Sequence, residues 1–211
     1  MFIILIGAPG SGKGTQGRFL SERLCCPHVS TGDIFREMAN STTLEGELIS
    51  AYTTKGILVP SDLVNGVVSS FLSIRAYLEH CILDGYPRNI SQAEFFSTVV
   101  RKVCVVYLKI SEQVALQRVL GRFSCAVCGQ IYNKTDTMPH IEDVCDVCSS
   151  SSFVYRGDDE VDVIHTRMKE YTRETQPVVE YYGRDGVLLT VDAEKKQEEV
   201  SSILLDLLKR V

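Results

Sequence analysis

The sequence lacks any long apolar run. Its first apolar segment, MFIILI, covers residues 1–6 and is followed by glycine, whereas a membrane-spanning helix needs roughly 18 or more apolar residues in succession. The same segment lacks the basic leader and the small-residue cleavage site of an export signal. These absences predict a protein that has no membrane partner and works in the cytoplasm.

Positive charge is also scarce. The chain contains 22 Lys and Arg against 27 Asp and Glu, which gives a formal net charge of -5. A broad surface for nucleic acid or for an anionic membrane requires an excess of Lys and Arg. The composition therefore argues against both partners, although it allows local clusters of positive charge.

Internal repeats and low-complexity tracts are absent as well. Hydrophobic residues make up 45% of the 211 residues, which is enough for a substantial core in one domain that carries insertions. We expect the chain to act as a monomer.

Five short apolar runs predict β-strands, and amphipathic stretches between them predict helices. The strands are expected at residues 1–6, 27–30, 80–84, 103–110 and 187–191, and the helices at 17–24, 62–78, 112–120, 161–182 and 198–211. Strands rich in Val and Ile that alternate with helices are typical of a parallel sheet covered on both faces. We therefore expect an open α/β fold whose ligand lies at the carboxyl ends of the strands.

The stretch GAPGSGKGTQ, residues 7–16, follows the first predicted strand and opens a helix, as a phosphate-binding loop does. Its glycines allow backbone N–H groups to converge on phosphate oxygens, and Lys13 adds a full positive charge. The common pattern has Ser or Thr directly after the lysine, whereas here Gly14 intervenes and Thr15 comes next. The sequence predicts a polyphosphate site in which Thr15 still reaches phosphate or a magnesium-bound water.

Four of the eight cysteines form the pattern C-x2-C-x16-C-x2-C, with members Cys125, Cys128, Cys145 and Cys148. This spacing is typical of a tetrahedral zinc site, and four thiolates leave no open coordination position, so the metal is expected to be structural. Disulfides and a redox dithiol are alternatives that a reducing cytoplasm disfavours. Iron in place of zinc stays open. The remaining cysteines lie on apolar segments and are expected to be packed core thiols: Cys25, Cys26, Cys81 and Cys104.

The phosphate-binding stretch, together with STGDIFRE at residues 30–37 and DGYPRNISQAE at 84–94, resembles the adenylate kinase family, specifically its long-lid bacterial type. The resemblance implies the P-loop nucleoside monophosphate kinase fold: a five-stranded parallel sheet flanked by helices, with two inserted mobile subdomains. The implied parts are a core at residues 1–29, 60–121 and 160–211, an AMP-binding subdomain at 30–59 and a zinc-binding lid at 122–159.

The resemblance also implies reversible phosphoryl transfer from MgATP to AMP, giving two ADP. Transfer of this kind is catalysed mainly by positioning and by cations. The implied catalytic charges are Lys13, Arg88, Arg122, Arg156 and Arg167. The implied ATP-binding residues are Gly10, Ser11, Gly12, Lys13, Gly14, Thr15, Arg118, Arg122, Ile131, Tyr132 and Lys195. The implied AMP-binding residues are Thr31, Arg36, Ile57, Leu58, Val59, Gly85, Tyr86, Pro87, Arg88, Gln92, Arg156 and Arg167.

Asp84 ends a predicted strand where the ligand should lie, and we expect it to order water around Mg²⁺, which keeps several waters and binds few carboxylates. Thr31 favours AMP as the acceptor, because relatives that phosphorylate UMP or CMP carry Ala there. A UMP/CMP kinase nevertheless stays an alternative. So do a P-loop ATPase and a zinc-ribbon module that uses nucleotide only as a signal, although no residue is an obvious activator of water. Ser61 stands where the family usually has an acid.

Overall fold

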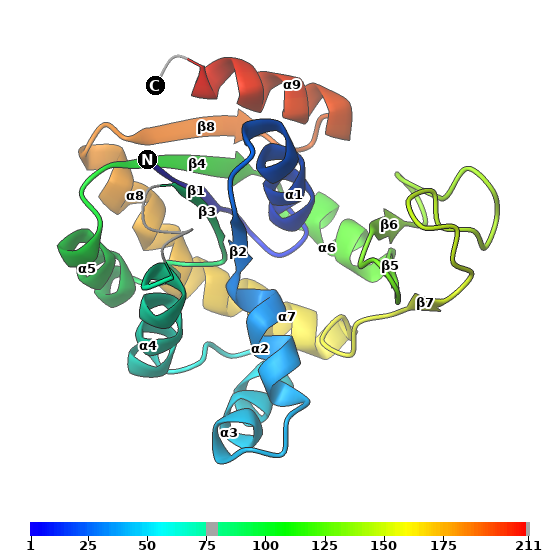
Figure 1. Ribbon diagram of the computed structural model, residues 1–211, viewed down its shortest axis with the longest axis horizontal. Helices are drawn as coiled ribbons and strands as arrows, with labels where there is room; N and C mark the ends of the chain where they lie inside the picture. Colours follow the sequence, from blue (N-terminus) through cyan, green and yellow to red (C-terminus); the bar gives the residue numbers. More distant parts are fainter. Residues whose placement is uncertain (75–79, 210–211) are drawn as a thin grey trace.

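A computed structural model describes residues 1–74 and 80–209. The five predicted strands form one parallel sheet in the order β2-β3-β1-β4-β8 (Figure 1). Their bounds are β1 (Phe2–Ile6), β2 (His28–Ser30), β3 (Cys81–Asp84), β4 (Val103–Lys109) and β8 (Leu188–Asp192). The predicted α/β fold with a five-stranded parallel sheet is therefore confirmed.

Both faces of the sheet are covered, which explains why β1 is an unbroken apolar run with all five residues buried. Successive side chains of a strand point to opposite faces. Ile4 packs in a cluster with Phe96 and Val178, whereas Leu5 packs in a second cluster with Leu20. The first cluster is covered by α4 (Ser61–Leu72), α5 (Ile90–Val99) and α8 (Gln176–Arg184), and the second by α1 (Lys13–Leu24) and α9 (Gln197–Leu208).

The five predicted helices are present with two differences, whereas α5 was not predicted. The stretch predicted as one helix at residues 161–182 consists of α7 (Val161–Glu170), a π-helical turn η2 (Tyr171–Thr175) and α8. Pro177 has no N–H to donate to the carbonyl of Arg173, and the helix accommodates the missing hydrogen bond by widening one turn. The helix predicted at 62–78 ends at Leu72 in the structure, and its positions 75–78 lie outside the described residues.

Two segments lie outside the layers of sheet and helices (Figure 1). One contains α2 (Thr31–Ala39) and α3 (Leu44–Thr53), whose first turns are capped by the hydroxyls of Ser30 and Thr43. The other, which we call the cysteine segment (residues 122–159), forms an antiparallel sheet in the order β6-β5-β7 and follows α6 (Glu112–Leu120). Its strands are β5 (Arg122–Cys125), β6 (Ile131–Asn133) and β7 (Phe153–Val154). The exact domain boundaries and the mobility of these segments stay predictions.

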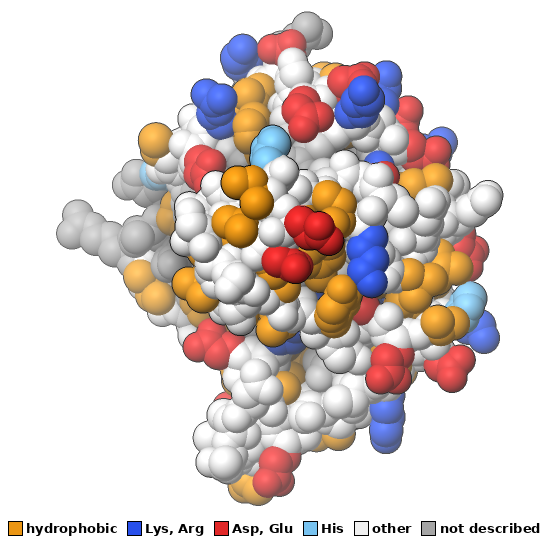
Figure 2. Space-filling model, turned by 90° about the vertical axis from the view of Figure 1, so that its right-hand side faces the viewer, with side chains coloured by type: hydrophobic (Ala, Val, Ile, Leu, Met, Phe, Trp, Pro, Cys, Tyr) orange, Lys and Arg blue, Asp and Glu red, His pale blue; other side chains and the backbone are white. Residues whose placement is uncertain are grey.

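The cysteine segment has a small core. Its buried cluster consists of Phe123, Cys125, Tyr132 and Cys145. Many of its other hydrophobic side chains are exposed, namely Val127, Met138, Ile141, Val147 and Val154. Figure 2 shows hydrophobic side chains beside charged ones on one face of the molecule. A unit that buries so little apolar surface needs a further stabilising element, such as a metal. None of the helices in the described ranges has the length and apolar character of a membrane span.

We expect Gly17→Ala to destabilise the protein although it lies inside a helix. Alanine normally favours a helix over glycine by roughly 0.5–1 kcal/mol. Here an added Cβ on Gly17 would lie 2.4 Å from Nε2 of His28, whose side chain is held between α1 and the sheet. Such overpacking costs about 1–3 kcal/mol. Thermal unfolding followed by circular dichroism would measure the loss.

The matched control is Gly66→Ala in α4, where an added Cβ meets no atom within 4 Å. This substitution should raise the midpoint of unfolding. If both variants are equally stabilised, the imidazole of His28 gives way without cost and the packing argument is wrong.

Candidate functional site

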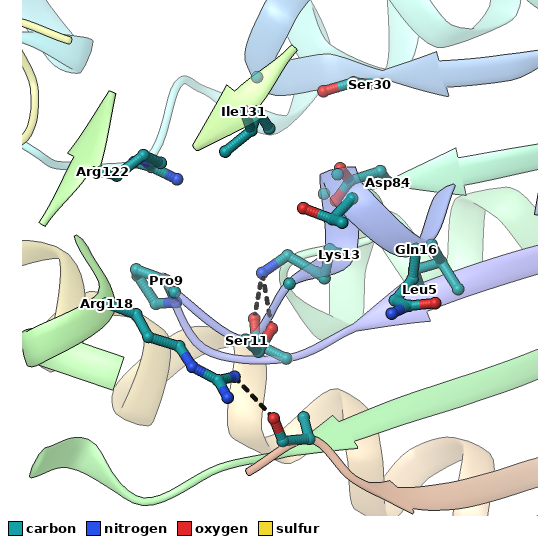
Figure 3. A pocket seen from close by; sticks show the side chains of 18 of the residues that line it. Leu5, Pro9, Ser11, Lys13, Gln16, Ser30, Asp84, Arg118, Arg122 and Ile131 are labelled. Carbon is teal, nitrogen blue, oxygen red and sulfur yellow. Dashed lines mark hydrogen bonds between the residues drawn. The ribbon is translucent and has the colours of Figure 1, made fainter. Parts of the chain in front are cut away.

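The carboxyl ends of β1, β2 and β3 open into a cavity of about 650 Å³ (Figure 3). It is lined by the loop after β1, by Asp84 at the end of β3, and by side chains from the cysteine segment and α7. A ligand at this edge of the sheet is what a parallel α/β fold favours. The site therefore lies where the strand pattern predicted it.

The loop between β1 and α1 is shaped by glycine. Gly10 and Gly12 have positive φ angles of 82° and 86°, which glycine adopts without steric cost. A Cβ on Gly10 would lie 2.4 Å from the carbonyl oxygen of Ala115. No side chain caps the first turn of α1, so its N–H groups are available to an anion. The loop is thus a backbone cradle for phosphate.

Lys13 turns back onto this loop (Figure 3). Its ammonium group donates to the carbonyl oxygens of Gly7 at 2.7 Å and Ala8 at 2.9 Å. Burial is the main cause that lowers the pKa of Lys13 to about 8; Asp84 opposes the shift, and Arg88 adds to it. An anionic ligand would stabilise the charged form, because an opposite charge raises the pKa of an amine.

Among residues 1–74 and 80–209, six arginines line the cavity: Arg36, Arg88, Arg118, Arg122, Arg156 and Arg167. Like charges at this density repel one another, and acids reduce the repulsion. The carboxylate of Asp159 accepts two hydrogen bonds from Arg122, at 2.8 and 2.5 Å, and lies 3.2 Å from Arg167. Burial would raise the pKa of Asp158, but Arg167 and Arg36 outweigh it and hold that pKa below its usual range. Both acids act as counter-charges to the arginines.

Arg88 is held from several sides. Its Nε donates to the carbonyl of Gly85 at 2.7 Å, its backbone N–H donates to Oε1 of Gln92 at 2.8 Å, and its carbonyl accepts from the hydroxyl of Thr175 at 2.9 Å. Burial first, and then the nearby Arg167, lower the pKa of Arg88 to about 10. The guanidinium of Arg88 therefore remains charged at neutral pH, and the backbone of this residue is held in place.

Most residues predicted from the sequence line this cavity. They are Gly10, Ser11, Gly12, Lys13, Gly14, Thr15, Arg36, Leu58, Asp84, Gly85, Pro87, Arg88, Arg118, Arg122, Ile131, Tyr132, Arg156, Arg167 and Lys195. Five predicted residues lie outside the lining: Thr31, Ile57, Val59, Tyr86 and Gln92. Thr31 and Gln92 are buried and bonded to the loop after β3.

Sequence reasoning missed several residues of the site. Asp33 pairs with Arg36 at 2.5 Å and lies 3.9 Å from Arg156. Its position three residues before Arg36 on a helix could have suggested this pair. Thr175 and Asn133 gave no comparable signal, because their partners, the backbone carbonyls of Arg88 and Arg118, are distant in the sequence.

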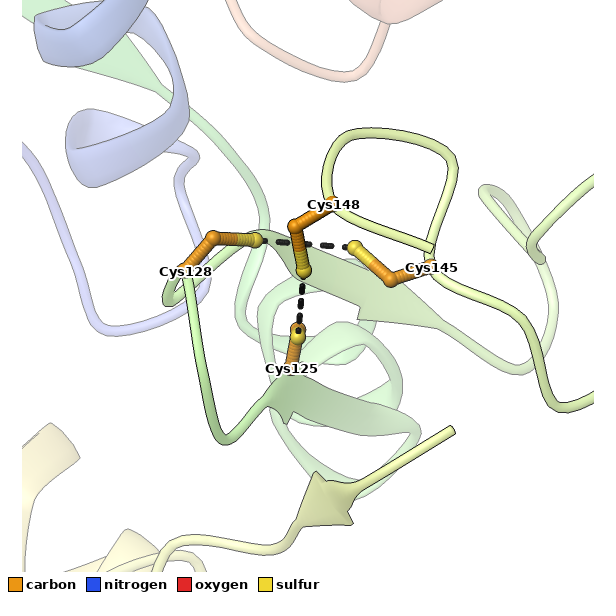
Figure 4. A group of neighbouring side chains, drawn as sticks. All are labelled: Cys125, Cys128, Cys145 and Cys148. Atoms are coloured by element: carbon orange, nitrogen blue, oxygen red, sulfur yellow. Dashed lines mark hydrogen bonds between the residues drawn. The ribbon is translucent and has the colours of Figure 1, made fainter. Parts of the chain in front are cut away.

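The four cysteines of the predicted metal site meet in space (Figure 4). Their sulfur atoms all lie within 4.8 Å of one another, and the pairs Cys125–Cys148 and Cys128–Cys145 are each 3.5 Å apart. A disulfide requires about 2 Å, so these pairs are thiols. Tetrahedral zinc with bonds of about 2.3 Å separates its sulfurs by about 3.8 Å, and the cluster fits this ion.

Of the other four cysteines, three are buried as predicted: Cys26, Cys81 and Cys104. The prediction for Cys25 is wrong, since this residue is exposed. It ends α1 in a left-handed conformation with a φ angle of 51°, and the chain turns there before the sheet is reached. Its position beyond the last helical turn directs the side chain to solvent.

Comparisons with known proteins agree with one another. The profile of the family described as "Adenylate kinase" matches residues 5–187. The chain is 44% identical over 211 residues to the adenylate kinase of Rickettsia prowazekii, with 99% of each chain covered. It is 41% identical over 210 residues to that of Rickettsia conorii and 42% identical over 210 residues to that of Rickettsia akari, again with 99% of each chain covered.

We expect Asp159→Asn to destabilise the ligand-free protein and to strengthen its response to polyphosphate. The substitution leaves Arg122 and Arg167 without this counter-charge, at a cost of about 1–3 kcal/mol. Inorganic tripolyphosphate should recover the loss, so the rise in Tm that it causes should exceed the rise in the unchanged protein. Differential scanning fluorimetry measures both quantities.

Asp162→Asn is the control, since it removes an exposed carboxylate from the first turn of the neighbouring helix α7. It should leave the tripolyphosphate response unchanged. Equal responses in all three proteins would contradict the role given to Asp159.

Proposed function

Because the chain belongs to the adenylate kinase family, we propose that it transfers the γ-phosphoryl group of MgATP reversibly to AMP, giving two ADP. The observation that carries this proposal is that a phosphate-binding loop and several arginines line one cavity. A phosphoryl group in transfer spreads negative charge over its oxygens, so positioned cations are its main catalysts.

In the proposed step, an oxygen of the AMP phosphate attacks the γ-phosphorus of ATP. The bond between that phosphorus and the β–γ bridging oxygen breaks, and ADP leaves with the electron pair. The attacking oxygen is already anionic, so no general base is required. The groups assigned to the charge of the transferred phosphoryl are Lys13, Arg88, Arg122, Arg156 and Arg167.

We assign the donor to the loop at residues 10–15. Backbone N–H groups and Lys13 would bind the phosphates there, and the adenine would lie near Arg118 and Lys195, with Ile131 and Tyr132 covering the nucleotide. Arg118 donates to the carbonyl of Ala193 at 2.6 Å, so its guanidinium plane is already held at this end of the cavity.

Mg²⁺ would enter bound to ATP. Asp84 fits a role toward its waters, because the carboxylate is buried at the end of β3 and lies close to the first turn of α1. The ion would supply positive charge to the β- and γ-phosphates.

We assign the acceptor to Arg36, Arg88 and the loop at residues 85–87, with residues 57–59 beside its ribose and base. Arginine suits the acceptor phosphate because its planar fork bonds two oxygens at once. Thr31 and Gln92 would read the adenine edge. Both are bonded to the loop after β3, so this reading requires Thr31 on α2 and Gln92 on α5 to exchange those bonds for the base when AMP binds.

The proposed organisation has a core at residues 1–29, 60–121 and 160–211, an AMP-binding subdomain at 30–59, and the cysteine segment as a lid that opens and closes. Closure would exclude water and protect the γ-phosphate from hydrolysis. We further propose a monomer in the cytoplasm, where a reducing compartment keeps the cluster as thiols.

The cluster of four thiols would hold zinc as a structural ion. Its donor set leaves no open position for a substrate. The cysteine segment needs such an ion because its hydrophobic core is small.

The test of the activity is an acceptor panel. Purified protein is incubated with MgATP and each nucleoside monophosphate in turn, and the diphosphates are separated by chromatography. We expect ADP from AMP, with Lys13→Ala and Arg88→Ala reducing kcat by about 10²-fold or more while circular dichroism stays unchanged.

Each other outcome identifies an alternative. Diphosphate formed best from UMP or CMP would indicate a pyrimidine kinase. Free phosphate released without an acceptor would indicate an ATPase, and ATP binding without transfer would indicate a binding module. Normal turnover in either variant would refute its assigned role.

Removal of the metal should lower Tm more than it lowers kcat at a temperature where the protein stays folded. Metal binding stabilises the cysteine segment and takes no part in the transfer step. The protein is treated with a chelator under reducing conditions, and unfolding and turnover are compared before and after zinc is restored. Immediate loss of transfer with the segment still folded would make the metal catalytic.

A further inference from the structure

The phenolic oxygen of Tyr132 lies at the edge of the cysteine cluster. Its O–H donates to Sγ of Cys145 at 3.4 Å, and the oxygen accepts from the backbone N–H of Asp146 at 2.8 Å. The side chain is 3% exposed. Within residues 1–74 and 80–209, it is the only hydroxyl that donates to any of the four sulfurs.

The position of this hydroxyl is fixed by its ring. The ring stacks on Phe123, with centroids 5.6 Å apart and planes at 23°, and meets the edge of Phe153 at 5.7 Å. The partner turn is also fixed, because the carboxylate of Asp146 accepts from the backbone N–H of His140 at 2.9 Å. The donor and the acceptor of the hydrogen bond from the hydroxyl to sulfur are therefore both held in place.

The same residue belongs to the nucleotide cavity. Tyr132 is the central residue of β6 and lines that cavity with its neighbours Ile131 and Asn133. The Cδ1 atom of Ile131 lies 3.7 Å from the place of a Cβ on Gly14, in the first turn of α1. Asn133 donates to the carbonyl of Arg118 at 2.7 Å. One short strand thus contacts the sulfur cluster and α6 and lies beside the first turn of α1.

We propose that Tyr132 is a positioning residue that ties the metal cluster to the nucleotide cavity. Its hydroxyl stabilises the anionic sulfur of Cys145 and keeps it at the ligand position, as outer hydrogen bonds do for metal ligands generally. In return, the metal-bound sulfur holds β6 against the phosphate loop. This inference rests on the proposed zinc site.

The test compares Tyr132→Phe with Tyr155→Phe. Phenylalanine keeps the ring contacts and removes only the hydroxyl. Tyr155 is the matched control, because it lies in the same segment and packs beside Phe123 at 6.1 Å, yet its side chain is exposed. Zinc-loaded proteins are mixed with an excess of a chromogenic zinc chelator, and the absorbance of its zinc complex gives the rate at which zinc leaves the protein. Cobalt-loaded samples are examined by visible absorption.

We expect Tyr132→Phe to release zinc roughly tenfold faster or more and to shift the thiolate-to-cobalt charge-transfer band. It should also raise KM for MgATP while kcat is kept. Tyr155→Phe should match the unchanged protein in every measurement.

Three outcomes are distinguishable. If the unchanged protein takes up no metal, the zinc site itself is refuted. If it binds zinc but Tyr132→Phe shows the same release rate and cobalt spectrum, the role of Tyr132 is overturned while the zinc site stands. Equal acceleration in both variants would also overturn it, because the effect would then not belong to the hydroxyl that contacts sulfur.

Discussion

The structure depends on the repulsion among positive groups gathered at one edge of a parallel sheet. In the described part of the chain, Lys13 and six arginines line a single cavity, an arrangement that is unfavourable unless opposite charge is present. Acids supply that charge in the structure, chiefly Asp158 and Asp159 at the end of the cysteine segment. Phosphate oxygens can replace these carboxylates as partners of the same guanidinium groups. The electrostatic repulsion among these positive groups therefore favours binding of a polyanion.

The fold brings these charges together by general rules of α/β structure. Parallel strands place their carboxyl ends at one edge, so the phosphate loop after β1 and Asp84 after β3 become neighbours. Arg36, Arg122 and Arg156 reach this edge from the segments outside the layers. The other arginines come from the loop after β3, from α6 and from α7. Because Arg122 and Arg156 are carried by the cysteine segment, the local electrostatics depends on where that segment lies.

The cysteine segment is a small unit whose order has to come from more than its core. Four buried side chains make up its hydrophobic cluster, and two of them are cysteines of the sulfur group. A bound metal and the aromatic packing around Tyr132 would then act on the same few residues. A structural ion can thus influence the positions of residues that line the cavity although it takes no part in phosphoryl transfer.

The sequence by itself determined the strands, the phosphate loop and the cysteine pattern, because these depend on local periodicity, glycine positions and short spacings. The five strands and the parallel α/β fold were predicted and confirmed, and the family was identified from three motifs. Only the tertiary structure decided which acids face which arginines, that Thr31 and Gln92 lie behind the cavity wall, and that Tyr132 contacts Cys145. Tyr132 and Cys145 are 13 residues apart in the chain, and Arg122 and Asp159 are 37 apart. The geometry of such contacts follows from packing that no local pattern encodes.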